Sequence, residues 1–404
     1  MADRKKVRVV ELFAGVGGFR LGLERCAPEV YETVWADQWE PGQARQWAWR
    51  CYTSHFGSCC NEDIATVLDQ VPEHDLLVGG FPCQDYSVAR TGARGIEGKK
   101  GVLWWSIDAV IRKRRPRFVL LENVDRLLKS PAHQRGRDFG IILKCLDQAG
   151  YGAEWRVINA ADYGEVQRRR RTFLFAYRLD AAPFGERSLL TAGGPRWLRE
   201  EGFFAGAFPV EREAADPRPT ELDLGQWEDL VAVSEGFQAP FRSGGALCRG
   251  RVWSEELVPV PPAKRLLLGD VVDRGGVDER YFLKAEELEK WKVMKGAKRI
   301  DRVSRTGFPY RFSEGAISFP DPLDRPARTM LTSEGTKNRS SHVVSDPRTG
   351  RLRRLTPEEC EQINGFDPGW TDTGMPERQR YFIMGNALVV PLVERMAARL
   401  LELL

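Results

Sequence analysis

The stretch Leu76-Leu-Val-Gly-Gly-Phe-Pro-Cys-Gln-Asp-Tyr-Ser87 decides the fold that we expect for this chain. Its apolar start, Leu76–Val78, is typical of a buried strand, and the two glycines that follow end the strand abruptly. Pro82 fixes its own φ and biases Phe81 toward an extended backbone, so the chain leaves the strand stiffly. Cys83 therefore follows the carboxyl end of a strand, where open α/β sheets place their chemistry. Taken alone, this cysteine is either a nucleophile or a buried structural thiol.

The composition is that of a globular protein with room for two or three domains. The chain has 404 residues, of which 42% are hydrophobic and 29% are charged. No apolar run approaches the ~20 residues that a membrane helix needs, and the start lacks a secretory pattern. The eight cysteines include no Cys-x-x-Cys, which indicates neither a zinc site nor a disulfide framework. We therefore expect a cytoplasmic protein with no metal centre and no membrane partner.

The net charge of +4 is weak, but the positive charges are clustered. The four basic clusters are Lys99–Arg117, Arg168–Arg171, Lys292–Arg305 and Arg348–Arg354. Any one of them is more often a solvated face than a binding site. For four clusters together, a surface that contacts phosphates is as good an interpretation as four solvated faces.

The first strand is expected at Val7–Leu12, and a glycine-rich turn, Phe13-Ala-Gly-Val-Gly-Gly18, joins it to a helix. This arrangement brings a backbone close to a nucleotide-like ligand at a helix N-terminus, although many glycine turns exist for steric reasons alone. The turn departs from the dinucleotide fingerprint, because Arg20 stands at the third glycine position. It therefore argues against a nicotinamide or flavin cofactor and favours a ligand without a pyrophosphate.

Acidic residues follow the predicted strands. The second strand, Glu32–Ala36, ends on Asp37, where a carboxylate either accepts hydrogen bonds from ribose hydroxyls or is an exposed loop acid. Asp63 either touches a ligand or caps a helix. The strand Arg117–Leu121 leads into Glu122, a second titratable group at the edge of the sheet that holds Cys83.

Strands alternate with helices up to about residue 180, which predicts an α/β fold with a doubly wound, mostly parallel, Rossmann-like sheet. Residues 181–325 are irregular and rich in Pro, Gly, Trp and charge. A helix is then expected after Leu355, with Thr356 and Glu359 forming a capping box. We expect a catalytic domain of residues 1–180, completed by 381–404, and a second, smaller domain of residues 181–380.

These residues, taken in order, resemble the DNA (cytosine-5) methyltransferases, and specifically the compact bacterial enzymes of restriction-modification systems. Glu11 stands where the family usually has Asp, and Asn364 where Gln is common. The resemblance covers the chain except for residues 181–325. The matching segments are Glu11–Gly18, Pro82–Gln84, Glu122–Val124, Gln167–Arg171, Arg353–Phe366 and Gly385–Ala387.

The resemblance implies that Cys83 is the nucleophile that attacks carbon 6 of a cytosine flipped out of double-stranded DNA. Glu122 would hydrogen-bond the exocyclic amine and donate a proton to ring N3. Arg169, supported by Arg171, would favour the thiolate over the thiol, although a structural salt bridge is the alternative for either arginine. Gln167 belongs to the same arginine motif.

The resemblance also implies S-adenosylmethionine as the methyl donor. Phe13 would pack on the adenine, Asp37 would hold the ribose hydroxyls and Asp63 would bind the adenine amine. Glu40 is the alternative to Asp37 as the ribose ligand, because the family motif can be aligned around Trp39 in more than one register. The remaining residues implied in the pocket are Gly15, Gly17, Leu103, Asn386 and Leu388.

In this family the variable region, here residues 181–325, is the target recognition domain, which reads base edges in the major groove. Asp85–Gly101 resembles the loop that closes over the flipped base, and Thr329 is a candidate phosphate contact. We expect a monomer in the cytoplasm, associated with the nucleoid through DNA. A restriction endonuclease could act on the same site without a stable complex. The sequence does not give the DNA site.

The nearest alternative is a transfer-RNA cytosine-5 methyltransferase, which shares the catalytic motifs. Such enzymes lack a large variable insert of the kind found here, which favours DNA as the substrate. A catalytically inactive DNA-binding regulator is disfavoured because no catalytic motif is degraded.

Overall fold

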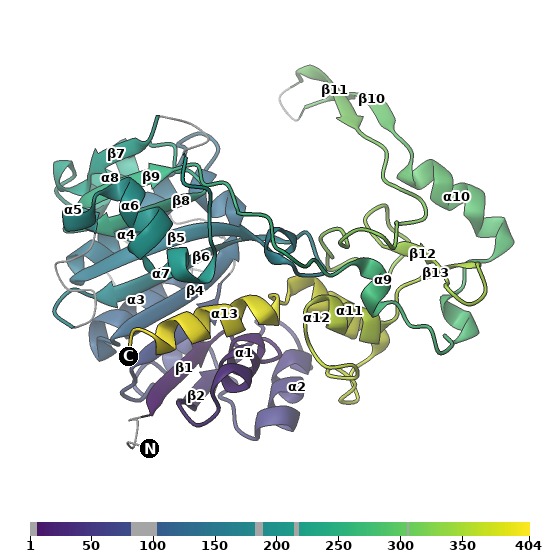
Figure 1. The fold of residues 1–404 in the computed structure, drawn as a ribbon, viewed down its shortest axis with the longest axis horizontal. Helices are drawn as coiled ribbons and strands as arrows, with labels where there is room; N and C mark the ends of the chain where they lie inside the picture. Colours follow the sequence, from purple (N-terminus) through teal and green to yellow (C-terminus); the bar gives the residue numbers. More distant parts are fainter. Residues whose placement is uncertain (1–5, 82–102, 182–188, 214–217, 305–306) are drawn as a thin grey trace. The chain divides into compact units, whose positions relative to one another are not determined.

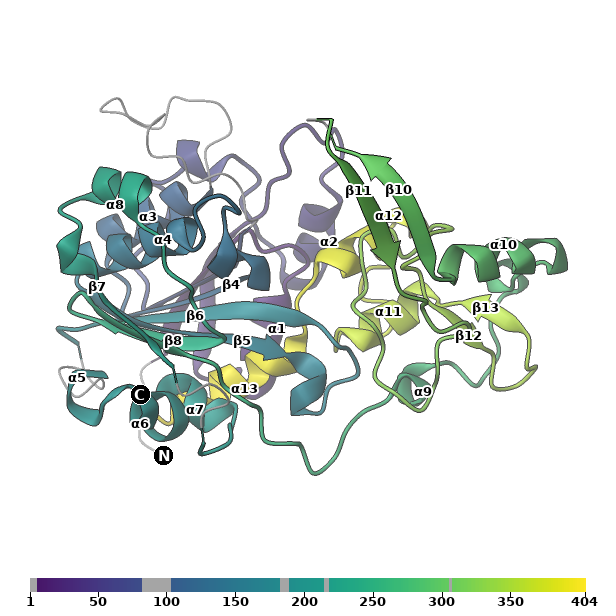
Figure 2. The ribbon, with the colours of Figure 1, turned by 90° about the horizontal axis from the view of Figure 1, so that it is seen from above.

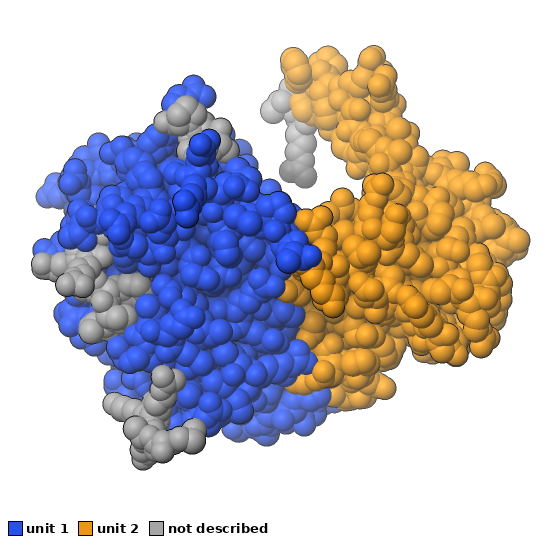
Figure 3. All heavy atoms as spheres, in the orientation of Figure 1, with its two compact units in different colours: residues 1–163, 170–263, 390–404 blue, residues 164–169, 264–389 orange. Residues whose placement is uncertain are grey.

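The computed structural model describes residues 6–81, 103–181, 189–213, 218–304 and 307–404. Cys83 and the expected closing loop Asp85–Gly101 lie outside these residues. The chain divides into two units, shown in Figure 3. Unit 1 comprises residues 1–163, 170–263 and 390–404, and unit 2 comprises residues 164–169 and 264–389.

Unit 1 is built on a nine-stranded sheet with the order β2-β1-β3-β4-β6-β5-β8-β9-β7 (Figure 1). Strands β2, β1, β3 and β4 are parallel, and the remaining described pairings of this sheet are antiparallel. The α/β, Rossmann-like fold is confirmed, with a mixed sheet. The strands are β1 Val7–Leu12, β2 Tyr31–Asp37, β3 Leu76–Gly80, β4 Phe118–Val124, β5 Tyr151–Asn159, β6 Arg170–Arg178, β7 Thr220–Asp223, β8 Gly244–Cys248 and β9 Arg251–Glu255.

Helices cover both faces of this sheet. Figure 2 shows α3, α4 and α8 on one face and α1, α7 and α13 on the other. The last helix packs closely on the first, because a Cβ at Gly22 would lie 2.6 Å from the Cβ of Val393. The helices of unit 1 are α1 Gly18–Cys26, α2 Trp47–Phe56, α3 Leu103–Arg114, α4 Arg137–Gln148, α5 Leu189–Ala192, α6 Gly194–Arg196, α7 Phe203–Ala207, α8 Leu230–Gly236 and α13 Val390–Leu401.

Residues 181–263 differ from the expected irregular region, because they extend the sheet of unit 1. Strand β8 is buried along its length and pairs with β5. Phe241 packs edge-on against Trp155 and Phe139, with ring centroids 5.5 and 5.0 Å apart. The compact units divide the chain at about residue 264 and after Val389, whereas the expected domains divide it at residues 181 and 381. Strands of four or five residues are too short to show a clear period in the sequence.

Unit 2 contains two small antiparallel sheets and four α-helices among its described residues. The capping box of α11 is confirmed: the Thr356 hydroxyl accepts from Glu359 N, and the Glu359 carboxylate accepts from Thr356 N. The elements are α9 Leu268–Val271, α10 Ala285–Lys295, β10 Lys298–Val303, β11 Pro309–Glu314, β12 Val343–Ser345, β13 Leu352–Arg354, α11 Pro357–Ile363 and α12 Glu377–Asn386.

In the part of the chain that the structure describes, no single helix is long and apolar enough to cross a membrane; by length and composition, only the bent pair α12 and α13 passes that test.

Candidate active site

The turn between β1 and α1 has a backbone that few side chains tolerate. Phe13 has a φ of 55°, Gly15 of 57° and Gly17 of 85°. A Cβ at Gly17 would lie 2.3 Å from the Phe56 ring, so this position needs glycine for space as well as for φ. A non-glycine residue with positive φ is uncommon and is often found at functional sites. The turn therefore carries the local strain expected of a ligand-binding loop.

The end of β2 is hydrogen-bonded to this turn. Ala14 N donates to the Asp37 carbonyl at 2.9 Å, and Gly15 N donates to Gln38 Oε1 at 2.7 Å. The Asp37 side chain is almost fully buried, and burial raises its pKa to about 7 against weaker opposing hydrogen bonds from Cys60 and the Glu62 backbone.

One Asp37 oxygen is available to a ligand. Among the described residues, Asp37 Oδ1 is buried without a hydrogen-bond partner, and a buried acceptor without a partner is costly unless something donates to it. The ribose hydroxyls of S-adenosylmethionine are donors of the required kind. This end of the sheet therefore fits that cofactor.

The other expected cofactor residues of unit 1 are placed as follows. Asp63 caps the short helix Ile64–Thr66, its Oδ1 accepting from Ala65 N at 3.0 Å, so the capping alternative is realised. Phe13 and Leu103 are half-buried and pack against the same hydrophobic core. Both side chains keep part of their apolar surface accessible.

Glu122 lies at the end of β4, where its carboxylate meets Arg171 of β6. Arg171 Nε lies 2.8 Å from Glu122 Oε1, and the side chains are 17% and 12% exposed. A Cβ at Gly80 would lie 3.3 Å from Glu122 Oε2, so the glycine that ends β3 leaves room beside this carboxylate. The two charged groups form a small, partly accessible polar edge.

The segment that leads into Cys83 is fastened to the same edge. Phe81 N donates to the Glu122 carbonyl at 3.4 Å, and Asn123 Nδ2 donates to the Phe81 carbonyl at 2.7 Å. Phe81 itself is buried and packs near Trp104, with ring centroids 6.1 Å apart. The chain is therefore held beside Glu122 two residues before Cys83.

Gln167 and Arg169 lie in unit 2 and are buried there. Gln167 Oε1 accepts from Met330 N at 2.9 Å, and its Nε2 donates to Asn364 Oδ1 at 2.7 Å. The Arg169 guanidinium donates to the carbonyls of Met330 and Gly385 at 3.2 and 3.0 Å. These bonds join three segments of unit 2, which is the geometry of a structural cross-link.

The segment Gly385–Leu388 closes α12 in unit 2. A Cβ at Gly385 would lie 2.4 Å from the backbone of Leu331 and Thr332, so the two segments approach closely. Asn386 is exposed and Leu388 is buried at the end of this segment.

Thr329, the candidate phosphate contact, donates its hydroxyl to the Arg168 carbonyl. The single donor of its side chain is therefore used within unit 2, which leaves the hydroxyl without a hydrogen to offer a phosphate.

Sequence analysis did not single out Glu11 as a site residue. Glu11 is buried in β1, and burial raises its pKa to about 7 although the Tyr52 hydroxyl donates to its Oε2 at 3.1 Å. Its Oε1 is buried without a hydrogen-bond partner among the described residues. The available signals were the position of Glu11 at the start of the first motif and its place near the end of a mostly apolar strand, just before the glycine turn.

Comparisons with known proteins identify the family. A family model described as C-5 cytosine-specific DNA methylase matches residues 7–194 and 269–402. The chain is 46% identical over 397 residues to the type II methyltransferase M.Sau3AI of Staphylococcus aureus, covering 96% of this chain and 94% of that protein. It is 33% identical to M.HaeII of Haemophilus aegyptius, covering 98% and 94%.

Solved structures share this fold. The S. pombe Dnmt2 methyltransferase superposes with a TM-score of 0.58 at 14% sequence identity, covering 98% of this chain and 99% of that one. At that identity the match shows the fold alone.

The chain therefore belongs to the C-5 cytosine-specific DNA methylase family. It is a DNA (cytosine-5-)-methyltransferase that uses S-adenosylmethionine, and DNA is its substrate. The resemblance inferred from the motifs is confirmed, and DNA rather than transfer RNA is the substrate class.

Proposed function

We propose that Cys83 is the nucleophile of this methyltransferase and that it forms a transient covalent bond to carbon 6 of the target cytosine. Carbon 5 of cytosine is a poor nucleophile. Addition of a thiolate to carbon 6 breaks the aromatic ring and places electron density on carbon 5. S-adenosylmethionine supplies the electrophilic methyl group. Loss of the carbon 5 proton to a base then restores the double bond and expels the Cys83 sulfur.

The observation that carries this proposal is the Glu122–Arg171 pair beside the segment that leads into Cys83. The Arg171 guanidinium forms an ion pair with one carboxylate oxygen at 2.8 Å, this oxygen has no hydrogen-bond partner among the described residues, and Gly80 leaves space beside the other oxygen. A carboxyl group held in this way can accept a hydrogen bond from the exocyclic amine of cytosine and serve ring N3 as a proton donor. In this proposal Arg171 orients the Glu122 carboxyl group. Arg169 would favour the Cys83 thiolate over the thiol, in addition to its structural hydrogen bonds within unit 2.

The proposed cofactor site lies at the ends of β1 and β2. The Phe13 ring would cover the adenine, and Asp37 would accept from the ribose hydroxyls, with Gly15 and Gly17 allowing close approach of the backbone. Asp63 would contact the adenine amine through the oxygen that does not cap its helix. Leu103, Asn386 and Leu388 would complete the apolar and polar lining.

We assign target recognition to residues 264–325 of unit 2, with residues 181–263 serving the catalytic unit. This region is narrower than the residues 181–325 expected from the sequence. The reason is that strands β7, β8 and β9, within residues 181–263, belong to the sheet of unit 1. The curated relatives M.Sau3AI and M.HaeII are named as type II methyltransferases. We therefore propose a monomeric modification enzyme that acts in the cytoplasm, beside a restriction endonuclease that cuts the same sequence without forming a stable complex.

Bisulfite sequencing of DNA from cells that express the chain tests this function. The wild-type chain should protect the cytosine at one position of one short sequence from conversion. Cys83→Ser should leave every cytosine convertible, whereas Cys26→Ser should behave as the wild type because Cys26 is only a half-buried residue at the end of α1. Protection by Cys83→Ser at wild-type level would refute the mechanism.

A further inference from the structure

The strands β10 and β11 of unit 2 form a two-stranded ribbon that pairs with no other described strand. Directly opposite residues share a face, so Asp301 and Arg311 lie on one face, and Arg302 and Tyr310 lie on the other. An isolated two-stranded hairpin is only marginally stable in water unless further strands or a helix pack against it. A two-stranded β-ribbon fits the major groove of B-form DNA.

The ribbon has the charge and exposure of a nucleic-acid contact. Residues 298–314 contain five basic and two acidic side chains, and most of the described ribbon is exposed, including Val303 at 68%. On the face that carries Arg302, the Arg302 guanidinium lies over the Phe312 ring, 4.0 Å from its centroid. The two side chains of this face therefore cover each other in part. The opposite face is left to a partner, and a positively charged face fits DNA, the substrate of this enzyme.

One arginine holds the start of β10 and the end of β11 together at the base of the ribbon. Arg339 donates to the carbonyls of Met294 and Gly296 before β10, at 2.8 and 2.7 Å, and to the carbonyl of Gly315 after β11. Its guanidinium also lies 3.5 Å from the Glu314 carboxylate. The spacing of the two strands at their base is therefore fixed by one side chain.

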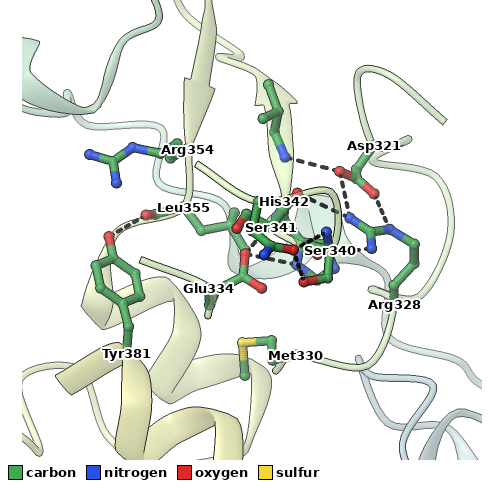
Figure 4. Close-up of polar contacts among 12 residues, drawn as sticks. Asp321, Arg328, Met330, Glu334, Ser340, Ser341, His342, Arg354, Leu355 and Tyr381 are labelled. Atoms are coloured by element: carbon green, nitrogen blue, oxygen red, sulfur yellow. Dashed lines mark hydrogen bonds and ion pairs between the residues drawn. The ribbon is translucent and has the colours of Figure 1, made fainter. Parts of the chain in front are cut away.

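The base of the ribbon rests on a buried polar network, shown in part in Figure 4. Asp321 accepts from Arg328 Nε at 2.6 Å and from Lys295 Nζ at 3.3 Å. Lys295, the last residue of α10, also donates to the Ser341 carbonyl at 2.6 Å, and Arg328 donates to the Ser340 carbonyl at 2.9 Å. A recognition element mounted on such a base is presented in one orientation.

Arg311 is prepared for bidentate recognition. Its Nε donates to Asp301 Oδ1 at 2.9 Å, although the two side chains are 70% and 79% exposed. Among the described residues, the two terminal amino groups of Arg311 have no hydrogen-bond partner. A bond through Nε orients the guanidinium and leaves these groups to face outward, which is the arrangement that pairs with O6 and N7 of guanine.

We propose that the β10–β11 ribbon enters the major groove and that Arg311, oriented by Asp301, recognises a guanine of the target sequence. The inference rests on the assignment of target recognition to residues 264–325 and names the residue that performs it. Every duplex target contains a guanine, because the methylated cytosine is paired with one.

The test measures kcat/KM for methyl transfer to a synthetic duplex that carries the sequence mapped by bisulfite sequencing. Each guanine is replaced in turn by 7-deazaguanine, which lacks the N7 acceptor. For one guanine, this replacement should lower kcat/KM of the wild type about tenfold or more, as should Arg311→Ala on the native duplex. The two losses should not add, so that Arg311→Ala is insensitive to 7-deazaguanine at that position.

Arg196→Ala is the matched control, because Arg196 is similarly exposed and is bonded through Nε to Glu201 at 2.6 Å in unit 1. It should respond to 7-deazaguanine as the wild type does. Arg311→Lys keeps the charge and should lose the discrimination as Arg311→Ala does. Binding of S-adenosylmethionine, measured by calorimetry, should be the same in all variants, which shows that each is folded.

Three results overturn the inference: a wild-type rate for Arg311→Ala on the native duplex, 7-deazaguanine losses that add to the Arg311→Ala loss at every position, or a wild type that is indifferent to 7-deazaguanine throughout. Failure of the proposed function looks different, because the wild type would then leave no cytosine protected from bisulfite.

Discussion

Arg171 and Glu122 form an ion pair at the edge of the sheet, beside the segment that leads into Cys83. Arg171 Nε, on the neighbouring strand, lies 2.8 Å from Glu122 Oε1, and both side chains keep some exposure at the edge of the sheet. Motif order in the sequence predicted that both residues belong to the site. It could not predict that they form an ion pair, because the pairing depends on the antiparallel register of β4 and β6.

Arg171→Ala should therefore lower the methylation rate about 100-fold, since a catalytic group displaced by a small distance loses about that much. Arg178→Ala is the control, because Arg178 lies at the other end of β6 and pairs with the exposed Asp180 at 2.8 Å. The measurement is tritium transfer from labelled S-adenosylmethionine to DNA. Equal losses for the two variants would contradict the role given to Arg171.

Asp37 predicts a pH dependence of cofactor binding. Its pKa is raised to about 7 by burial, so the carboxylate that binds ribose hydroxyls most strongly forms as the pH rises through 7. The affinity for S-adenosylmethionine, measured by calorimetry, should increase between pH 6 and pH 8. Asp37→Asn should weaken binding and remove the dependence. If Glu40→Gln removes the dependence instead, Glu40 is the ribose ligand.

At the scale of elements, the Leu-Thr-Pro motif before and within α11 organises a buried charge cluster. Arg353 of β13 donates to both oxygens of Glu359, at 2.7 and 2.9 Å, and to Asp346 at 3.0 Å. The capping box was predictable, because it depends on residues three apart. The partners of Arg353 were not, because neither the strand that carries it nor the position of Asp346 is evident from the sequence.

Arg353→Ala should lower the free energy of unfolding by about 3–5 kcal/mol, because it leaves two carboxylates buried without a counter-charge. Arg351→Ala should leave stability almost unchanged, because Arg351 pairs with Glu279 at the surface. Urea denaturation followed by circular dichroism measures both. A small effect of Arg353→Ala would show that the cluster does not hold α11 and β13 together.

At the scale of the whole molecule, the sequence predicted the strands up to about residue 180, β5 and β6 among them, and missed β7, β8 and β9. The motifs fall on β1, β3, β4 and β6, whose apolar runs and glycine turns are clear in the sequence. Strands β7 to β9 are short, and they become regular only by pairing: β8 pairs with the buried strand β5, β9 pairs with β8, and β7 pairs with β9. Residues 181–263, which were expected in the smaller domain, therefore belong to unit 1.

Three buried carboxyls predict how the stability of the whole chain depends on pH. Burial raises the pKa values of Glu11, Asp37 and Glu154 to about 7. The folded chain thus holds protons that the unfolded chain releases near pH 4, so the free energy of unfolding should fall as the pH rises from 5 to 8, by about 1–3 kcal/mol for each carboxyl. Urea titrations in the absence of cofactor measure this slope, and Glu154→Gln should reduce it. A stability that rises over this range would contradict the burial of these groups as the dominant effect.

The covalent bond between the enzyme and its substrate is the most direct test of the central claim. Duplex fragments in which 5-fluorocytosine replaces every cytosine should trap the enzyme in the presence of S-adenosylmethionine, because fluorine at carbon 5 blocks the final elimination. The account predicts a complex that survives denaturation for the wild type and for Cys26→Ser, and none for Cys83→Ser. A denaturation-resistant complex formed by Cys83→Ser would contradict it.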